Sequence, residues 1–197
     1  MHIDNIKEIG WIMNSDGMDF ICCRDVLVEN TFQRNYDDNV TIKAFNATPE
    51  YIASHTNTDG SYSDGAIWMV AGLRDFEVCN YEIRNCVFWA DKAHNMLVGP
   101  EARGIAFRNI RFHDNIVLEN RQNGRITGVK DIKSFDEKEI LLFTQAGKLV
   151  IKGEQLHVKQ LDLEKGEVDL EGKVDSLTYL SKNTDKKEES LLKRMFR

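Results

Sequence analysis

Three runs in this chain share one short pattern, in which apolar residues alternate with other residues and the run ends in asparagine. The runs span residues 26–30, 81–85 and 105–109, and an aromatic residue follows each asparagine two or three positions later. Asparagine tolerates the left-handed backbone conformation, so it suits a tight corner where a strand changes direction. The second and third runs are 24 residues apart. A fixed period of this order indicates stacked units of secondary structure.

This repeat predicts an all-β fold that begins with a partial right-handed parallel β-helix. We expect parallel strands over residues 15–120, with Asn85 and Asn109 at equivalent corners one coil apart. The competing interpretation is an antiparallel sandwich, in which a strand recurs about every 8–12 residues. The repeat in this chain is longer than that spacing, so the stacked coils are preferred.

The use of basic residues changes near Asn123, which divides the chain into two modules. Residues 1–123 contain 8 Arg and 3 Lys, whereas residues 124–197 contain 3 Arg and 12 Lys. All 3 Trp and all 4 Cys also precede the change. We therefore expect the truncated β-helix in residues 1–123 and a small antiparallel β domain in residues 124–181. Residues 182–197 are expected to be a polar tail that ends in a short amphipathic helix.

Charge and hydropathy exclude several classes of protein. A net charge of −6 argues against a nucleic-acid partner. The sequence has no run of about 18 apolar residues, so no transmembrane segment is expected, and no export signal is visible at its start. The four cysteines lack the spacing of a zinc site and are expected to be buried free thiols in a reducing compartment. The sequence therefore predicts a cytoplasmic protein without a metal or other cofactor.

Three aspartates are placed where stacked coils would bring them together. Asp16 precedes Asp37 by 21 residues, about one coil, and Asp38 follows directly. In a β-helix this spacing places the three carboxylates on one face. Clustered carboxylates repel one another, so one keeps its proton while the others stay ionised and activate water. Hydrolysis of a glycosidic bond requires that division of roles.

The residues around these aspartates resemble those of a known group of enzymes. Residues 14–19 (NSDGMD) and 37–43 (DDNVTIK) are similar to two motifs of the polysaccharide hydrolases of the pectin-lyase-like superfamily, above all the polygalacturonases of glycoside hydrolase family 28. The resemblance implies an inverting hydrolase in which Asp37 is the general acid, while Asp16 and Asp38 position the attacking water. It also implies a polysaccharide partner and a substrate contact by Lys43.

Two features of the sequence modify what this resemblance implies. The histidine that polygalacturonases carry about one coil later is missing from residues 60–65, and the pair of basic residues that grips uronate carboxylates is not recognisable. A neutral glycan is therefore the expected substrate. His94 has two interpretations, as a substrate-binding residue on the same face and as a polar residue that caps a coil. The aspartate cluster is likewise either a working site or the relic of one in a truncated helix.

From Gly124 the pattern changes to short alternating strands separated by glycines, which predicts an antiparallel meander or a small barrel-like sandwich. Several segments of this module resemble the YabP/YqfC family of sporulation proteins. The segments are residues 126–130, 134–137, 147–153, 161–174 and 177–180. The resemblance implies a non-enzymatic β protein that acts in the mother cell during endospore formation. Its expected partners are a second copy of the chain or another sporulation protein.

Two functions of different class follow from these resemblances. The preferred function is that of a sporulation-associated, non-enzymatic YabP-like protein that carries an inactive polysaccharide-hydrolase fragment at its start. The alternative is an inverting glycoside hydrolase with an accessory β domain. A further explanation of the change near Asn123 is that two unrelated reading frames have been joined.

Overall fold

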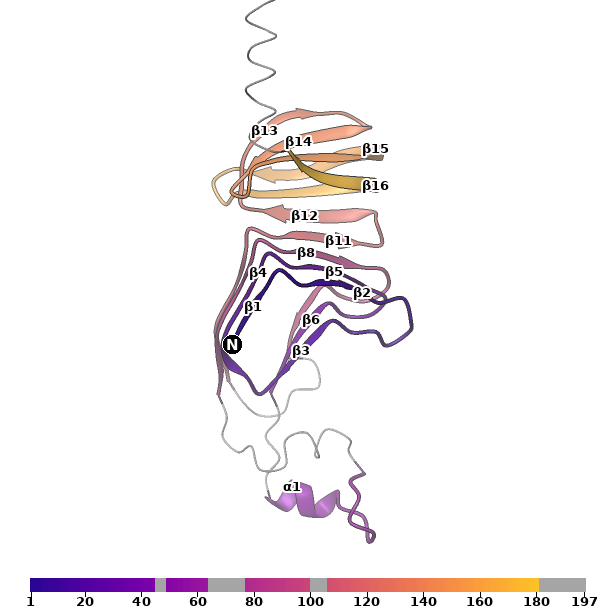
Figure 1. The fold of residues 1–197 in the computed structure, drawn as a ribbon, viewed down its shortest axis with the longest axis vertical. Coiled ribbons are helices and arrows are strands. Elements are labelled where there is room, and N and C mark those ends of the chain that lie inside the picture. Colours follow the sequence, from indigo (N-terminus) through magenta and orange to yellow (C-terminus); the bar gives the residue numbers. More distant parts are fainter. Residues whose placement is uncertain (45–48, 64–76, 100–105, 181–197) are drawn as a thin grey trace, which may run out of the picture. The chain divides into compact units, whose positions relative to one another are not determined.

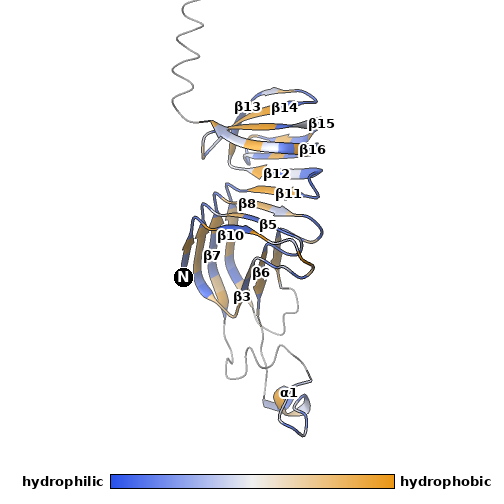
Figure 2. Cartoon of the chain, turned by 45° about the vertical axis from the view of Figure 1, so that its right-hand side comes forward, coloured by the Kyte–Doolittle hydropathy of each residue, from blue (hydrophilic) through white to orange (hydrophobic). Residues whose placement is uncertain are grey.

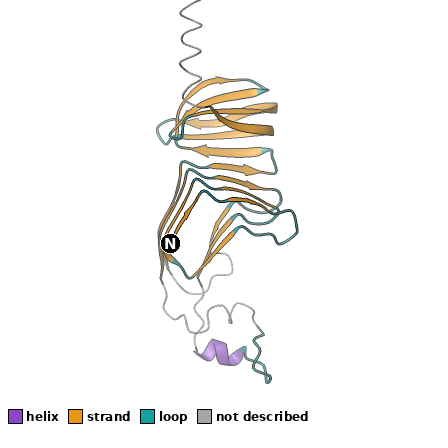
Figure 3. Ribbon diagram, viewed as in Figure 1, coloured by secondary structure: helices purple, strands orange, loops and turns teal. Residues whose placement is uncertain are grey.

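The computed structural model describes residues 1–44, 49–63, 77–99 and 106–180 (Figure 1). Strands dominate these residues, and the helix α1 (Pro49–Ser54) is short (Figure 3). The prediction of an all-β chain is therefore confirmed. The chain divides into two compact units, Met1–Phe112 and His113–Arg197.

The first unit contains three groups of strands, and strands β1 to β9 pair in parallel within them. The first group is β1 (His2–Asp4), β4 (Arg24–Glu29), β7 (Val78–Arg84) and β10 (Phe107–His113); the second is β2 (Lys7–Ile9), β5 (Phe32–Asn35) and β8 (Val87–Ala90); the third is β3 (Met18–Ile21), β6 (Val40–Lys43) and β9 (Met96–Val98). The chain runs through the three groups in turn. Each such pass of the chain adds one strand to each group, beside the strand from the previous pass. These parallel registers exclude the antiparallel sandwich for the described strands of this unit.

Alternating residues form the core of the first unit. In β4, Val26 and Val28 are buried whereas Leu27 lies nearer the surface, because successive side chains of a strand point to opposite faces. Alternating apolar and polar colours follow the strands in Figure 2. Phe20 and Tyr81 meet edge to face within the core, with ring centroids 5.6 Å apart. The core therefore joins strands from different groups and different passes.

The asparagines of the repeat form two separate ladders. Asn85 donates a side-chain hydrogen bond to Asn30, whereas Asn109 donates one to Asn80 over 2.8 Å. Asn80 in turn donates to Asp25 over 2.8 Å. The prediction that Asn85 and Asn109 occupy equivalent corners is therefore wrong.

The two asparagines differ because they stand at different points of their strands. β7 ends at Arg84, so Asn85 follows its strand, whereas β10 continues to His113, so Asn109 lies within its strand. Both have positive φ, 52° and 53°, so the two places use the same backbone conformation. The true repeat runs from Asn80 to Asn109, a separation of 29 residues.

The four cysteines are all free thiols. Cys22 and Cys86 are buried, as expected, while Cys23 and Cys79 are partly buried. Burial raises the pKa of the Cys86 thiol to about 11 and also raises the pKa of Cys23. Both thiols therefore stay protonated at neutral pH, which makes them poor nucleophiles.

The second unit holds six strands that pair antiparallel in the order β13-β14-β15-β16-β12-β11. These strands are β11 (Ile116–Glu119), β12 (Asn123–Thr127), β13 (Val129–Phe135), β14 (Glu139–Thr144), β15 (Lys148–Asp162) and β16 (Glu167–Leu180). The last two strands, of 15 and 14 residues, are longer than the predicted short strands. The hairpin continues past Gly153 because shifts of register there bend it without ending it.

A small apolar core supports this sheet. Leu142 in β14, Leu149 in β15 and Leu170 in β16 are at most 1% exposed. Gly172 has a φ of 125°, and a Cβ there would lie 2.3 Å from the carbonyl oxygen of Gln155. Glycine therefore lets β15 and β16 approach closely where their register shifts.

Parts of the chain named by the sequence analysis lie outside the described residues. The tail of residues 182–197, with its expected helix, is one of them, and the last two residues of the segment 60–65 are another. Of the helical segments that are described, none is long and apolar enough to cross a membrane.

Candidate functional site

Asp16, Asp38 and His94 form a column at one end of the third group of strands. Each lies two residues before the first residue of a strand, β3, β6 and β9 respectively, and these strands pair in that order. The carbonyl oxygen of Asp38 accepts a hydrogen bond from the Gly17 N–H over 2.7 Å, and that of His94 accepts one from the Asn39 N–H over 3.0 Å. Backbone hydrogen bonds thus hold successive passes in register just ahead of the strands.

The carboxylates around Asp16 raise the pKa of its side chain. Burial contributes most, followed by repulsion from Asp19 and Asp37, with a smaller contribution from Asp38. Lys43 acts in the opposite direction. The structure therefore brings Asp16, Asp37 and Asp38 close enough for their charges to interact, and it favours the protonated form of Asp16.

Lys43, at the end of β6, is held by Asp19 in β3. The Lys43 ammonium nitrogen lies 3.0 Å from Asp19 Oδ2, and Asp19 Oδ1 accepts a hydrogen bond from the Thr41 hydroxyl. The side chain of Lys43 is only 13% exposed, so this ion pair is partly shielded from water. Asp19 belongs to the NSDGMD motif, but no role was predicted for it from the sequence. The structure makes it the residue that orients Lys43.

His94 contacts the site through Asp38. Its Nδ1 lies 3.3 Å from Asp38 Oδ1, and its backbone N–H donates to the same oxygen over 2.9 Å. The His94 side chain is 67% exposed, whereas that of Asp38 is 19% exposed. His94 therefore fits both interpretations, since it lies on the face of the aspartates and also bonds the preceding pass at a corner.

Buried amides follow the column and connect the passes. The Asn35 side chain donates to Asn39 Oδ1 over 3.0 Å, and the Asn39 side chain donates to Asn95 Oδ1 over 2.8 Å. All three residues are at most 2% exposed. In the first pass the place of Asn39 is taken by Gly17, where a Cβ would lie 2.3 Å from the Asn39 carbonyl oxygen. This network fixes the loops that carry the aspartates.

A second group of side chains stacks across three passes at the end of β2, β5 and β8. The guanidinium carbon of Arg34 lies 4.4 Å from the ring centroid of Trp89 and 5.4 Å from that of Trp11. Asp91 accepts hydrogen bonds from Arg34 at both of its oxygens, over 3.1 and 3.2 Å. This stack was not predicted from the sequence. A signal was present, because Arg34 and Trp89 are separated by the same 55 residues as the first two asparagines of the repeat.

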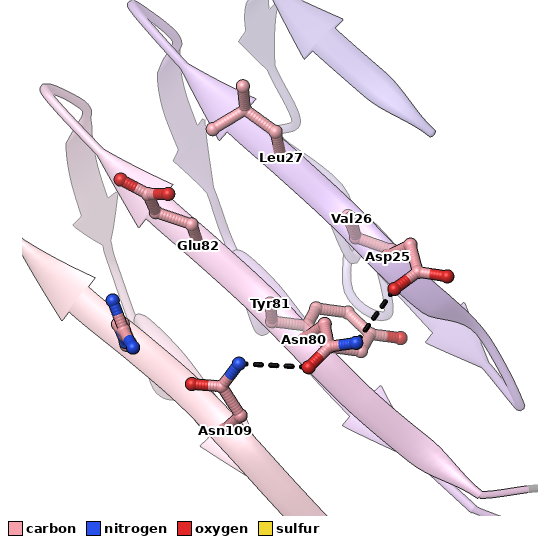
Figure 4. A pocket seen from close by; sticks show the side chains of 8 residues that line it. Asp25, Val26, Leu27, Asn80, Tyr81, Glu82 and Asn109 are labelled. Carbon is pink, nitrogen blue, oxygen red and sulfur yellow. Dashed lines mark hydrogen bonds between the residues drawn. The ribbon is translucent and has the colours of Figure 1, made fainter.

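A shallow hollow lies elsewhere, over β4, β7 and β10 (Figure 4). Its polar lining consists of the ladder of Asp25, Asn80 and Asn109 together with Glu82 and Arg111. Asn80 hydrogen bonds to both of its neighbours in the ladder, so these side chains bind one another. None of the site residues expected from the sequence lines this hollow, which is therefore distinct from the carboxylate site.

The chemistry open to the carboxylate site is proton exchange and hydrogen bonding to hydroxyl groups. Across the residues that the structure describes, no three His, Cys, Asp or Glu side chains come together so that they could hold a metal ion. The chain's own contribution is therefore a set of closely spaced carboxylate acceptors, among which burial and repulsion raise the pKa of Asp16.

The second unit is similar to known proteins. The YabP family matches residues 111–186. Spore protein YabP of Bacillus subtilis (strain 168) is 38% identical over 85 residues, which are 43% of this chain and 84% of that protein. The chain belongs to the YabP family. Strands β11 to β16 all lie within the YabP match, whereas the aspartate cluster, Lys43 and His94 precede it.

The YabP resemblance expected for residues 124–197 is thus confirmed, and the match begins earlier, at residue 111. The YabP match ends at residue 186, so it includes the long hairpin of β15 and β16. Because the carboxylate site lies before this match, membership of the YabP family assigns it no role. The resemblance of that site to polysaccharide hydrolases rests on its two sequence motifs.

Proposed function

We propose that this chain acts in spore formation as a non-enzymatic β protein of the YabP family. The observation that carries the proposal is its 38% identity to a protein named Spore protein YabP, over 84% of that protein's length. The proposed location is the mother-cell cytoplasm of an endospore-forming bacterium, where we expect the chain to gather against the surface of the developing spore. The proposed partner is another sporulation protein or a second copy of this chain.

The edge strand β13 suits such a partner. It lies at the end of the strand order, so its backbone offers hydrogen-bonding groups that a partner strand can use. Charged residues at Lys130, Asp131 and Lys133, and shifts of register against β14, discourage unspecific pairing at the same edge. These features support a selective partner over open-ended aggregation.

We assign the first unit, residues 1–112, to a partial right-handed parallel β-helix, which is shorter than the expected module of residues 1–123 because β11 and β12 pair antiparallel within the second unit. The parallel registers of β1 to β9 and the return of the chain to each group of strands support this assignment. Residues 113–181 then form the YabP-like domain, and residues 182–197 are its tail. In this proposal the β-helix carries the residues of a polysaccharide-hydrolase site but does not have the activity of such a site.

The electrostatics of the site support an inactive relic. The resemblance to hydrolases implies that Asp37 donates a proton while Asp16 and Asp38 position water. Burial and repulsion from neighbouring carboxylates raise the pKa of Asp16, which disfavours the ionised form that a residue activating water requires. Asp38 is also engaged by His94. The roles that hydrolysis requires are therefore poorly matched to this arrangement.

The alternative function is an inverting glycoside hydrolase acting on a neutral polysaccharide, which the closeness of Asp16, Asp37 and Asp38 favours. Its test is the release of reducing sugar from dextran, pullulan and polygalacturonate by the full chain, where we expect no release. Release that is abolished by Asp37→Asn and retained by the control Asp59→Asn, an exposed acid outside the cluster, would replace the first proposal with this one.

The proposed spore function is tested by the location of the chain in sporulating cells. We would express the full chain, joined to a fluorescent protein, in Bacillus subtilis strain 168 and follow it through sporulation. Fluorescence that gathers around the developing spore on its mother-cell side is the expected result. Fluorescence that stays evenly spread through the mother cell, with intact protein on an immunoblot, would contradict the proposal.

A further inference from the structure

We propose that a second copy of this chain pairs with the last part of β16, residues 176–180, and extends the sheet of the second unit. The inference rests on the proposed function, because it names which of the two proposed partners uses this edge. Among the described strands, β15 pairs along the whole of β16, whereas β12 pairs with residues 167–171 of it. Residues 176–180 therefore have a described strand on one side, and the other side is open to strand addition.

The edge formed by residues 176–180 lacks the features that keep edge strands from pairing. Its sequence is SLTYL, which contains no charged residue and no proline. Its five residues pair with β15 in unbroken register, so no bulge bends this part of the strand. Threonine and tyrosine also favour the strand conformation. A regular, uncharged edge of this kind pairs readily with another strand.

The other open edges of the second unit are protected. β13 carries three charged residues and two shifts of register, and the Asp131 carboxylate accepts a hydrogen bond from the Ile132 N–H over 2.8 Å. Residues 157–162 of β15 pair with β16 but not with β14, and this segment contains a shift of register and the ion pair of Lys159 with Glu171. Charges and bulges hinder pairing. Residues 176–180 are therefore the edge best suited to a second copy, and β13 stays available to a different partner.

The sequence of this edge is complementary to itself. In an antiparallel pair related by a two-fold axis at Thr178, Leu177 of each copy lies opposite Tyr179 of the other copy. Opposing residues point to the same face, so an aliphatic side chain meets an aromatic one twice. The two Thr178 side chains meet at the axis, and paired threonines stabilise a sheet. This reciprocity favours a second copy over an unrelated strand.

The side chains that would meet have surface left to bury. Tyr179 is 41% exposed, and Leu177 is partly buried. A hydrogen bond with the Thr144 side chain holds the Tyr179 hydroxyl. An ordered side chain loses less conformational entropy when a partner arrives. Pairing would therefore remove apolar surface from water at a low cost in order.

Charge also permits two copies of the second unit to approach each other. Residues 113–197 contain 16 basic and 16 acidic residues, whereas residues 1–112 contain 10 basic and 16 acidic residues. A net charge near zero favours association, because copies with little net charge do not repel one another. The edge itself carries no charge that would select a partner of opposite sign.

The experiment is sedimentation velocity of the full chain over a series of concentrations. We expect a reversible dimer with a dissociation constant on the order of 10 μM, since a five-residue strand buries less than a standard interface. Thr178→Lys and Thr178→Glu should each weaken the dimer about tenfold or more, because like charges then face each other at the axis. An equal mixture of these two variants should dimerise again, because opposite charges meet. Ser134→Lys, which adds the same charge to an exposed position of β13, is the control and should leave the dimer unchanged.

Three results would overturn the inference. The first is a full chain that stays monomeric at about twenty times the expected dissociation constant. The second is a dimer that Ser134→Lys abolishes and Thr178→Lys leaves intact. The third is a mixture of the two charged variants that stays monomeric although circular dichroism shows both to be folded. Because location in sporulating cells is a separate measurement, failure of dimerisation leaves the proposed spore function standing, and the reverse also holds.

Discussion

Gly17 shows how a single residue shapes the carboxylate site. Its N–H donates to the Asp38 carbonyl oxygen, which brings the first pass against the second. Any Cβ at this position would lie 2.3 Å from the Asn39 carbonyl oxygen and 2.4 Å from the Gln33 side-chain nitrogen. The motif glycine is therefore required by close approach of backbone, whether or not the aspartate beside it takes part in chemistry.

Gly17→Ala should destabilise the first unit by about 1–3 kcal/mol, because the added methyl group must push the Asn39 backbone away. Denaturant unfolding followed by tryptophan fluorescence measures this, since all 3 Trp lie in the first unit. Lys92→Ala, at an exposed position, is the control and should change stability by less than about 0.5 kcal/mol. Equal stability of the two variants would contradict the close contact.

Asp16→Asn should raise the melting temperature of the first unit at pH 7. The pKa of Asp16 is higher in the folded chain than its ordinary value of 3.8, so ionisation above that value costs folding stability. The gain should disappear below about pH 3.8, where Asp16 is protonated in both the folded and the unfolded state. Melting curves from pH 3 to pH 8 test this, and a gain that grew toward low pH would have the wrong sign.

At the level of elements, local patterns were predictable from the sequence and long-range registers were not. The alternation in β4 or β14 is a property of neighbouring residues, so it identified strands and core correctly. The equivalence of Asn85 and Asn109 failed because it depends on which strands pair. The stack of Arg34 between two tryptophans was missed for the same reason, since its members meet only when three passes are in register.

Asn80 offers a test of the ladder over β4, β7 and β10. Asn80→Gly should cost about 1–2 kcal/mol, because two hydrogen bonds are lost while the φ of 60° stays accessible. Asn80→Ala should cost roughly 1 kcal/mol more, since alanine resists that φ. Guanidinium unfolding of both variants measures the difference. An alanine variant as stable as the glycine variant would contradict this account.

At the level of the whole molecule, each unit has its own core. The second unit buries apolar residues from every strand between β11 and β16. The first unit has its own cluster around Tyr81 and Phe88. The two modules could be predicted from the sequence, because the change from arginine to lysine is counted over many residues and does not depend on which strands pair. The two units can therefore be assigned different functions.

Residues 113–197 expressed alone should unfold in one cooperative transition. The sheet of β11 to β16 contains all of its antiparallel partners within this range. A domain of this size has marginal stability, so we expect it to associate through a sheet edge. Calorimetry and analytical ultracentrifugation measure both properties. Residues 1–112 alone are expected to aggregate or to melt without a sharp transition. If residues 1–112 folded alone while residues 113–197 were disordered, folding of the chain would depend on the first unit.

The measurement that bears most directly on the central claim compares two fluorescent fusions in sporulating Bacillus subtilis strain 168, one of the full chain and one of residues 113–197. If the YabP-family unit carries the function, both fusions gather around the developing spore on the mother-cell side. The account is contradicted if the full chain gathers there while residues 113–197, intact on an immunoblot, remain spread through the cell, because the first unit would then carry the function.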